Sequence, residues 1–245
     1  MEKDRINEVK CLTLVRDSFC GNGKLNKLFD NSDFSKVISI LKSTHPNKNH
    51  SKFPDFFFDG GIIEHFEVTA SIEKNKKGSL HRINDANCER EIEKHFKQLD
   101  KEFIENPHHP GTMKTETFEA THDYFTYELF VKSFKRNTEH HLKSLRESEY
   151  LNQVVVFLIE LTSPDLCIYV NNQFNRFYKL SEDKKLLQYI KESLKDVNYI
   201  IFKTTGDYEI IDLFKIDSVI DKAKDNLDIR GGREKNTFIK LYFDY

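Results

Sequence analysis

The sequence PDFFFDGGIIEHFEVTAS, residues 54–71, decides how the central part of the chain folds. Two runs of β-prone residues flank Gly60-Gly61, and a glycine pair between such runs is typical of a tight turn. The stretch therefore predicts a β-hairpin with strands at 54–59 and 61–70. The second strand is mostly Ile, Phe and Val, yet it also carries Glu64, His65 and Glu67. Such side chains are costly to bury unless their charges are used.

Side chains alternate between the two faces of a strand. We therefore expect His65, Glu67 and Thr69 on one face, and Glu64 on the other, in solvent or paired with a basic residue. Asp55, on the first strand, is expected to lie beside the later part of the second strand and to meet Glu67. Because hard divalent cations prefer oxygen ligands, two converging carboxylates predict a Mg²⁺ site, with Mn²⁺ as an alternative ion.

The remaining pattern predicts a single α/β domain over residues 1–245, with a central mixed β-sheet flanked by helices. Its parts are a helical N-terminal portion (1–50), a core (51–215) and a C-terminal extension (216–245) that ends in a strand. Residues 153–161, apolar almost throughout, predict a central strand covered on both faces. Helices are expected at 84–103, 119–147 and 181–195, and further strands at 166–170, 199–203, 208–214 and 237–243.

Pro54-Asp55 followed by Glu67-Val68-Thr69 on a strand resembles the PD-(D/E)xK nuclease superfamily, which has a restriction-endonuclease-like core. The order of elements also matches, with a helix before the hairpin and a helix and central strand after it. The resemblance covers residues 30–215, and its specific residues lie within 54–77. It implies that the Asp55 and Glu67 carboxylates and the backbone carbonyl of Val68 bind Mg²⁺, and that a metal-bound water attacks a phosphodiester.

The family's lysine, which positions or deprotonates that water, falls on Thr69, which has no charge. Lys77 is the candidate replacement because Gly78 follows it, and His65 is an alternative that supports the water or binds phosphate. The basic loop at 73–82 is expected to contact backbone phosphates of nucleic acid. Its candidate binding residues are Lys74, Lys76, Lys77, His81 and Arg82. The plain alternative is a solvated turn.

The chain of 245 residues has a net charge of −2 and a pI near 6.6, so nucleic-acid binding needs a local basic patch. Its four cysteines are scattered without zinc-finger spacing, which is typical of reduced intracellular proteins. No signal-peptide pattern or membrane-spanning apolar run is present in the sequence. We therefore expect a cytoplasmic protein without a membrane partner.

Three functions compete at this point. The resemblance implies a metal-dependent endonuclease that hydrolyses nucleic acid, with DNA favoured, in restriction, phage defence or repair, as a homodimer or with a defence-complex partner. The replacement of the lysine by Thr69 motivates a second hypothesis, an inactive module of the same fold that binds nucleic acid or a partner protein. The third is an unrelated α/β interaction protein, in which Asp55 bonds to nearby backbone amides and Glu67 faces solvent.

Overall fold

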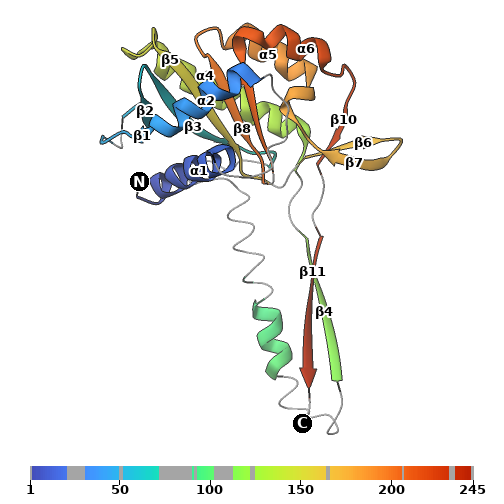
Figure 1. Cartoon of the computed structure of the whole chain (residues 1–245). Helices are drawn as coiled ribbons and strands as arrows, with labels where there is room; N and C mark the ends of the chain where they lie inside the picture. Colours follow the sequence, from blue (N-terminus) through green and yellow to red (C-terminus); the bar gives the residue numbers. More distant parts are fainter. Residues whose placement is uncertain are drawn as a thin grey trace.

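The computed structural model describes residues 2–20, 31–49, 52–71, 90, 93–101, 113–121, 125–163, 166–205, 207–231 and 235–243. Its centre is a six-stranded mixed sheet with the order β1-β2-β3-β5-β8-β9 (Figure 1). The strands are β1 (His45–Pro46), β2 (Phe56–Phe58), β3 (Gly61–Val68), β5 (Val154–Leu161), β8 (Tyr199–Lys203) and β9 (Tyr208–Asp212). The predicted α/β domain with a central mixed sheet is confirmed.

Strands β3, β5 and β8 are parallel, and antiparallel strands pair at both sides of them. Parallel neighbours need a crossover, which helix α4 (Tyr127–Arg146) provides between β3 and β5. Helix α5 (Lys184–Ser193) precedes β8 in the same way. The carboxyl ends of the three parallel strands therefore lie at one edge of the sheet, where ligands bind in open α/β folds.

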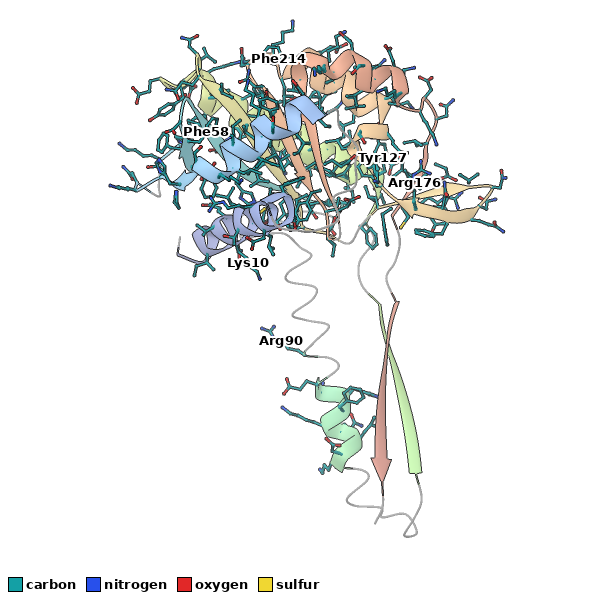
Figure 2. The ribbon with its side chains drawn as sticks, in the orientation of Figure 1. Lys10, Phe58, Arg90, Tyr127, Arg176 and Phe214 are labelled. Carbon is teal, nitrogen blue, oxygen red and sulfur yellow. The ribbon has the colours of Figure 1, made fainter. Side chains whose placement is uncertain are left out.

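Helices cover both faces of the sheet, as Figure 1 shows. Helices α1 (Glu2–Cys20) and α2 (Asn31–Ser43) pack on one face, against residues such as Ile63, Val156 and Leu158. Helices α4, α5 and α6 (Ile216–Lys222) pack on the other, against Phe66, Phe157 and Phe202 among others. Figure 2 shows side chains filling the space between these layers, with Lys10 on the outer side of α1. Since β5 is buried on both faces, its nearly continuous apolar sequence is explained.

Two smaller sheets lie beside the central one. Strands β6 (Cys167–Val170), β7 (Gln173–Phe177) and β10 (Asp228–Arg230) form one, with the left-handed residues Asn171 and Asn172 between β6 and β7. Strands β4 (Met113–Thr121) and β11 (Lys235–Phe243) form an antiparallel ribbon that extends away from the central sheet (Figure 1). The predicted final strand is confirmed, whereas the helix predicted from 119 begins only at Tyr127, after the Thr126 cap.

The hairpin turn lies at Asp59-Gly60, one residue earlier than predicted. Gly60 has φ +86°, which favours glycine. Gly61 instead begins β3, where an added Cβ would lie 2.1 Å from the Val154 carbonyl oxygen. The resulting register pairs Phe56 with Ile63 and so places Asp55 opposite Glu64.

None of the helices in the described part of the chain combines the length and the apolar character needed to cross a membrane.

Candidate active site on strand β3

Asp55 and Glu64 form a reciprocal pair at the open end of the β2–β3 hairpin. The Asp55 backbone N–H donates to Glu64 Oε2 at 3.2 Å, and the His65 backbone N–H donates to Asp55 Oδ2 at 2.8 Å. Strand β2 ends its pairing at Ile63, so the Asp55 carboxylate takes the place of the next strand partner at the edge of β3. The two carboxyl groups are thereby fixed beside each other.

A histidine from helix α4 completes this group. His141 Nδ1 lies 2.7 Å from Glu64 Oε1, and its ring stacks on Phe66 with 4.5 Å between ring centroids. Burial raises the pKa of Glu64 to about 8 and lowers the pKa of His141 to about 4. Burial thus favours the uncharged forms of both groups and a neutral hydrogen bond between the Glu64 carboxyl and the His141 ring.

Asp55 is affected by the same surroundings. Burial, and next the charge of Glu64, raise its pKa to about 6, although the hydrogen bond from the His65 N–H acts in the opposite direction. Two adjacent carboxyls that resist simultaneous ionisation are stabilised by a cation placed between them. The donor set at this end of the hairpin therefore fits a hard divalent ion.

Helix α4 contacts β3 through a polar stripe with four-residue spacing, formed by Ser133, Asn137 and His141. Ser133 Oγ accepts from the Thr69 N–H at 3.1 Å, and Asn137 Nδ2 donates to the Glu67 carbonyl oxygen at 2.7 Å. Residues four apart lie on one helix face, so the stripe follows the strand from Thr69 back to Glu64. This stripe fixes how the helix lies over the candidate site.

The predicted pairing of Asp55 with Glu67 is wrong. Glu67 lies opposite Glu160 of β5, and its side chain is on the α1 face because it is three residues from Glu64. The Val68 carbonyl, predicted to bind metal, accepts from the Thr162 N–H at 3.0 Å and the Thr162 hydroxyl at 3.3 Å, which occupies its lone pairs. Thr69 is buried, and its Oγ1 accepts from the Ser71 N–H, so its role is structural.

Glu64 was expected in solvent or beside a basic residue. It is only 5% exposed, so it does not face solvent, and its partner is the His141 ring. His65 shares a face with Glu67 as predicted, but it contacts Glu160 and reaches the Asp55 carboxylate only through its backbone N–H. Lys74, Lys76, Lys77, His81 and Arg82 lie outside the described residues, so their predicted roles stay predictions.

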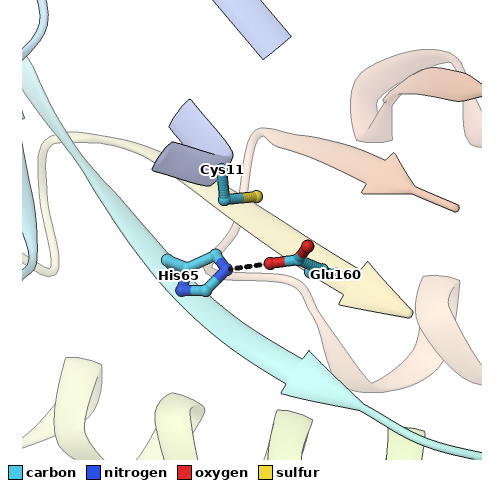
Figure 3. A group of neighbouring side chains, drawn as sticks. All are labelled: Cys11, His65 and Glu160. Carbon is cyan, nitrogen blue, oxygen red and sulfur yellow. Dashed lines mark hydrogen bonds and ion pairs between the residues drawn. The ribbon is translucent and has the colours of Figure 1, made fainter. Parts of the chain in front are cut away.

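A second polar group lies on the other face of β3, under helix α1. His65 Nε2 is 3.2 Å from Glu160 Oε2, and Lys203 Nζ donates to Glu160 Oε1 at 2.5 Å. Cys11 of α1 completes the group (Figure 3), and ligand atoms of Cys11, His65 and Glu160 all lie within 4.8 Å of one another. Glu67, Glu160 and Lys203 are register neighbours near the carboxyl ends of the parallel strands.

Some of the site residues that the sequence analysis did not predict have a recognisable pattern in the sequence. Glu160 interrupts an otherwise apolar strand, and Ser133, Asn137 and His141 share one helix face. Cys11 and Lys203 carry no such signal, since only the tertiary structure places them beside Glu160.

Comparison of the chain with protein-family models, with curated proteins and with solved structures gives no match.

Proposed function

We propose that this protein is a metal-dependent nuclease whose cation site is formed by Asp55 and Glu64. The observation that carries the proposal is the pair of adjacent, partly desolvated carboxyl groups at the open end of the β2–β3 hairpin. Two such oxygen donors suit Mg²⁺ or Mn²⁺. When bound there, the ion supplies an activated water and neutralises charge that develops on a phosphodiester.

The order of helices and strands around Asp55 and Glu64 supports the hypothesis of a restriction-endonuclease-like fold. Helix α2, the antiparallel β1-β2-β3 meander, helix α4 and the parallel strand β5 come in this chain order, with β4 of the separate ribbon between β3 and α4. The resemblance places its acidic pair on the two strands of a hairpin that follows a helix and precedes a helix and a central strand. This order supports a site on the hairpin, and in our proposal Glu64 takes the role of the second carboxylate that the sequence assigned to Glu67.

The residue two positions after Glu64 is Phe66, so the usual position of the lysine again lacks a charge. A basic group is available from another direction. Lys52 is exposed and lines the same surface depression as Asp55, together with Glu8 and Asn47. We assign Lys52 the role of orienting the phosphate or the water, with Lys77 of the basic loop as the other candidate.

The test is cleavage of supercoiled plasmid DNA, and of single-stranded DNA and RNA, with Mg²⁺ or Mn²⁺. We expect Asp55→Asn and Glu64→Gln each to reduce the rate by about 10²-fold or more while the thermal unfolding transition persists. Glu67→Gln is the matched control and should retain most of the activity. Loss of cleavage in Glu67→Gln but not in Glu64→Gln would return the site to the pair expected from the sequence.

A second function is favoured by the uncharged residues at 66 and 69. In a non-catalytic module of this fold, nucleic acid or a partner protein binds without being cut. Binding that tolerates EDTA, together with no cleavage of any of these substrates by the wild type, supports this module over the nuclease. DNA as the preferred substrate, a dimer or defence-complex partner and a cytoplasmic location are predictions that accompany either function.

A further inference from the structure

The group under helix α1 is distinct from the proposed nuclease site and lies on the other face of β3. Cys11 is 2% exposed and His65 is 7% exposed, and both side chains point toward Glu160 (Figure 3). Three elements that are far apart in the sequence, α1, β3 and β5, each contribute one of these residues. Among the described residues, this is the group of three whose ligand atoms lie within 4.8 Å of one another.

We propose that Cys11, His65 and Glu160 form a zinc site with three protein ligands. The donor set decides the ion class, because a thiolate and an imidazole suit zinc, whereas Mg²⁺ prefers oxygen ligands alone. The spacing agrees with this choice. Two ligands at about 2.0–2.1 Å from a tetrahedral ion lie about 3.3 Å apart, and His65 Nε2 and Glu160 Oε2 are separated by 3.2 Å.

Lys203 orients the Glu160 carboxylate so that one of its oxygens can bind the metal. Its ammonium holds Glu160 Oε1, so Oε2 is left facing His65. Hydrogen bonds to the outer oxygen of a ligating carboxylate orient it in many metal sites. Hydrogen bonds from His65 and Lys203 also outweigh burial and lower the pKa of Glu160 to about 2, which keeps it anionic.

The charges balance when zinc enters. When zinc binds, the Cys11 thiol releases its proton to solvent, and His65 Nε2 gives up the hydrogen that it donates to Glu160, so its lone pair can bind the ion. The thiolate and the Glu160 carboxylate together offset the two positive charges of the ion. Burial, and next the charge of Glu160, raise the pKa of the Cys11 thiol well above its usual range, so the metal-free group holds a neutral thiol. Because zinc displaces protons from its thiol and imidazole ligands, zinc affinity should increase with pH. A bound ion would also fasten α1 to the central sheet.

The experiment uses the full chain, purified without chelators, and measures its metal content and its absorption spectrum after replacement of zinc by Co²⁺. We expect about one zinc per chain, and for Co²⁺ a sulfur-to-cobalt charge-transfer band with the visible bands of a tetrahedral ion. Removal of the metal should lower the midpoint of thermal unfolding by several degrees.

Cys11→Ser should abolish the charge-transfer band, and Glu160→Gln should weaken Co²⁺ binding by at least tenfold. Cys167→Ser, at a partly buried cysteine on β6, is the matched control and should leave the spectrum unchanged. If Cys11→Ser does not fold, the wild-type spectrum still decides. Cobalt bound without the charge-transfer band, or wild-type protein that binds neither ion, overturns the zinc site and leaves an ordinary hydrogen-bonded group. Neither result bears on cleavage at Asp55 and Glu64.

Discussion

Glu64 carries a carboxyl group within a strand whose other contacts are mostly apolar. A buried carboxylate without a counter-charge is unfavourable, so burial raises the pKa of Glu64 and favours its protonated form beside the His141 ring. The Glu64 carboxyl group is therefore suited to bind a cation, because a metal ion can replace its proton.

This protonation predicts how the stability of the metal-free protein depends on pH. The folded-state pKa of Glu64, about 8, is above the usual value of 4.5. Its contribution is therefore fully present below about pH 4.5 and is lost as the pH rises through about 8. In EDTA, Glu64→Gln should become more stable relative to the wild type between pH 5 and pH 9, by roughly 1–3 kcal/mol.

Denaturant unfolding of the wild type and of Glu64→Gln at pH 5 and pH 9 measures the difference in their free energies of unfolding. Asp55 and His141 contact or sense Glu64, so the measured difference reports residue 64 together with its effect on these two neighbours. Glu192→Gln, at an exposed position on α5, is the matched control for loss of a carboxyl group outside the site. A constant difference between Glu64→Gln and the wild type at all pH values would show that Glu64 is ionised in the folded protein.

At the scale of elements, the position of one turn decides which carboxylate meets Asp55. In a two-strand hairpin, a shift of the turn by one residue moves each cross-strand partner by two. A turn at Gly60-Gly61 would place Asp55 opposite Phe66 and beside Glu67. The observed turn at Asp59-Gly60 places it opposite Glu64.

The two glycines should therefore respond differently to substitution. Gly61→Ala forces a Cβ to within 2.1 Å of the Val154 carbonyl oxygen and 2.4 Å of the Phe58 ring. We expect it to destabilise the fold by about 2 kcal/mol or more. Gly60→Ala meets nothing within 4 Å, so only its positive φ is unfavourable, at about 1 kcal/mol.

Thermal and denaturant unfolding of the two variants, side by side, check this order. Equal effects of the two substitutions would mean that β3 does not approach β5 as closely at Gly61 as the structure has it.

Much at this scale was predictable from local pattern. The hairpin, the buried strand at 154–161, α5 and the β8–β9 pair follow from periodicity and turn residues. Local pattern did not predict that residues 119–121, the first residues of the predicted helix 119–147, form part of a strand. Residues 113–121 pair with β11, which is more than a hundred positions away in the chain. A distant strand partner overrides local helical spacing there.

At the scale of the whole molecule, the chain leaves the central sheet after Ser71 and returns to it at Phe125. These two residues form an antiparallel bridge, and the Thr126 N–H donates to the Ala70 carbonyl oxygen at 2.9 Å. The described core residues lie between Cys11 and Ala70 and between Phe125 and Ile220. The sheet and its covering helices thus have a core whose described members come from outside 72–124.

This organisation predicts that residues 72–124 can be replaced by a short Gly-Ser linker. We expect the shortened chain to keep a cooperative thermal unfolding transition within a few degrees of the wild type, since the bridge already holds its ends together. Circular dichroism and calorimetry measure this. The variant also lacks the basic loop at 73–82, so its affinity for nucleic acid should fall.

An unfolded product would contradict the first expectation, and undiminished nucleic-acid binding by a folded product would contradict the role of the basic loop. The two readouts are independent, so each expectation can fail alone.

The sequence by itself determined that residues 54–71 form a hairpin with charged residues in a buried strand, because turn residues and side-chain alternation are local properties. It did not determine which charges meet. Glu64 and His141 are 77 positions apart, and His65 and Glu160 are 95 apart. Only the tertiary structure, through the register of the hairpin and the crossover of α4, brings these groups within hydrogen-bonding distance and divides them between the two faces of β3.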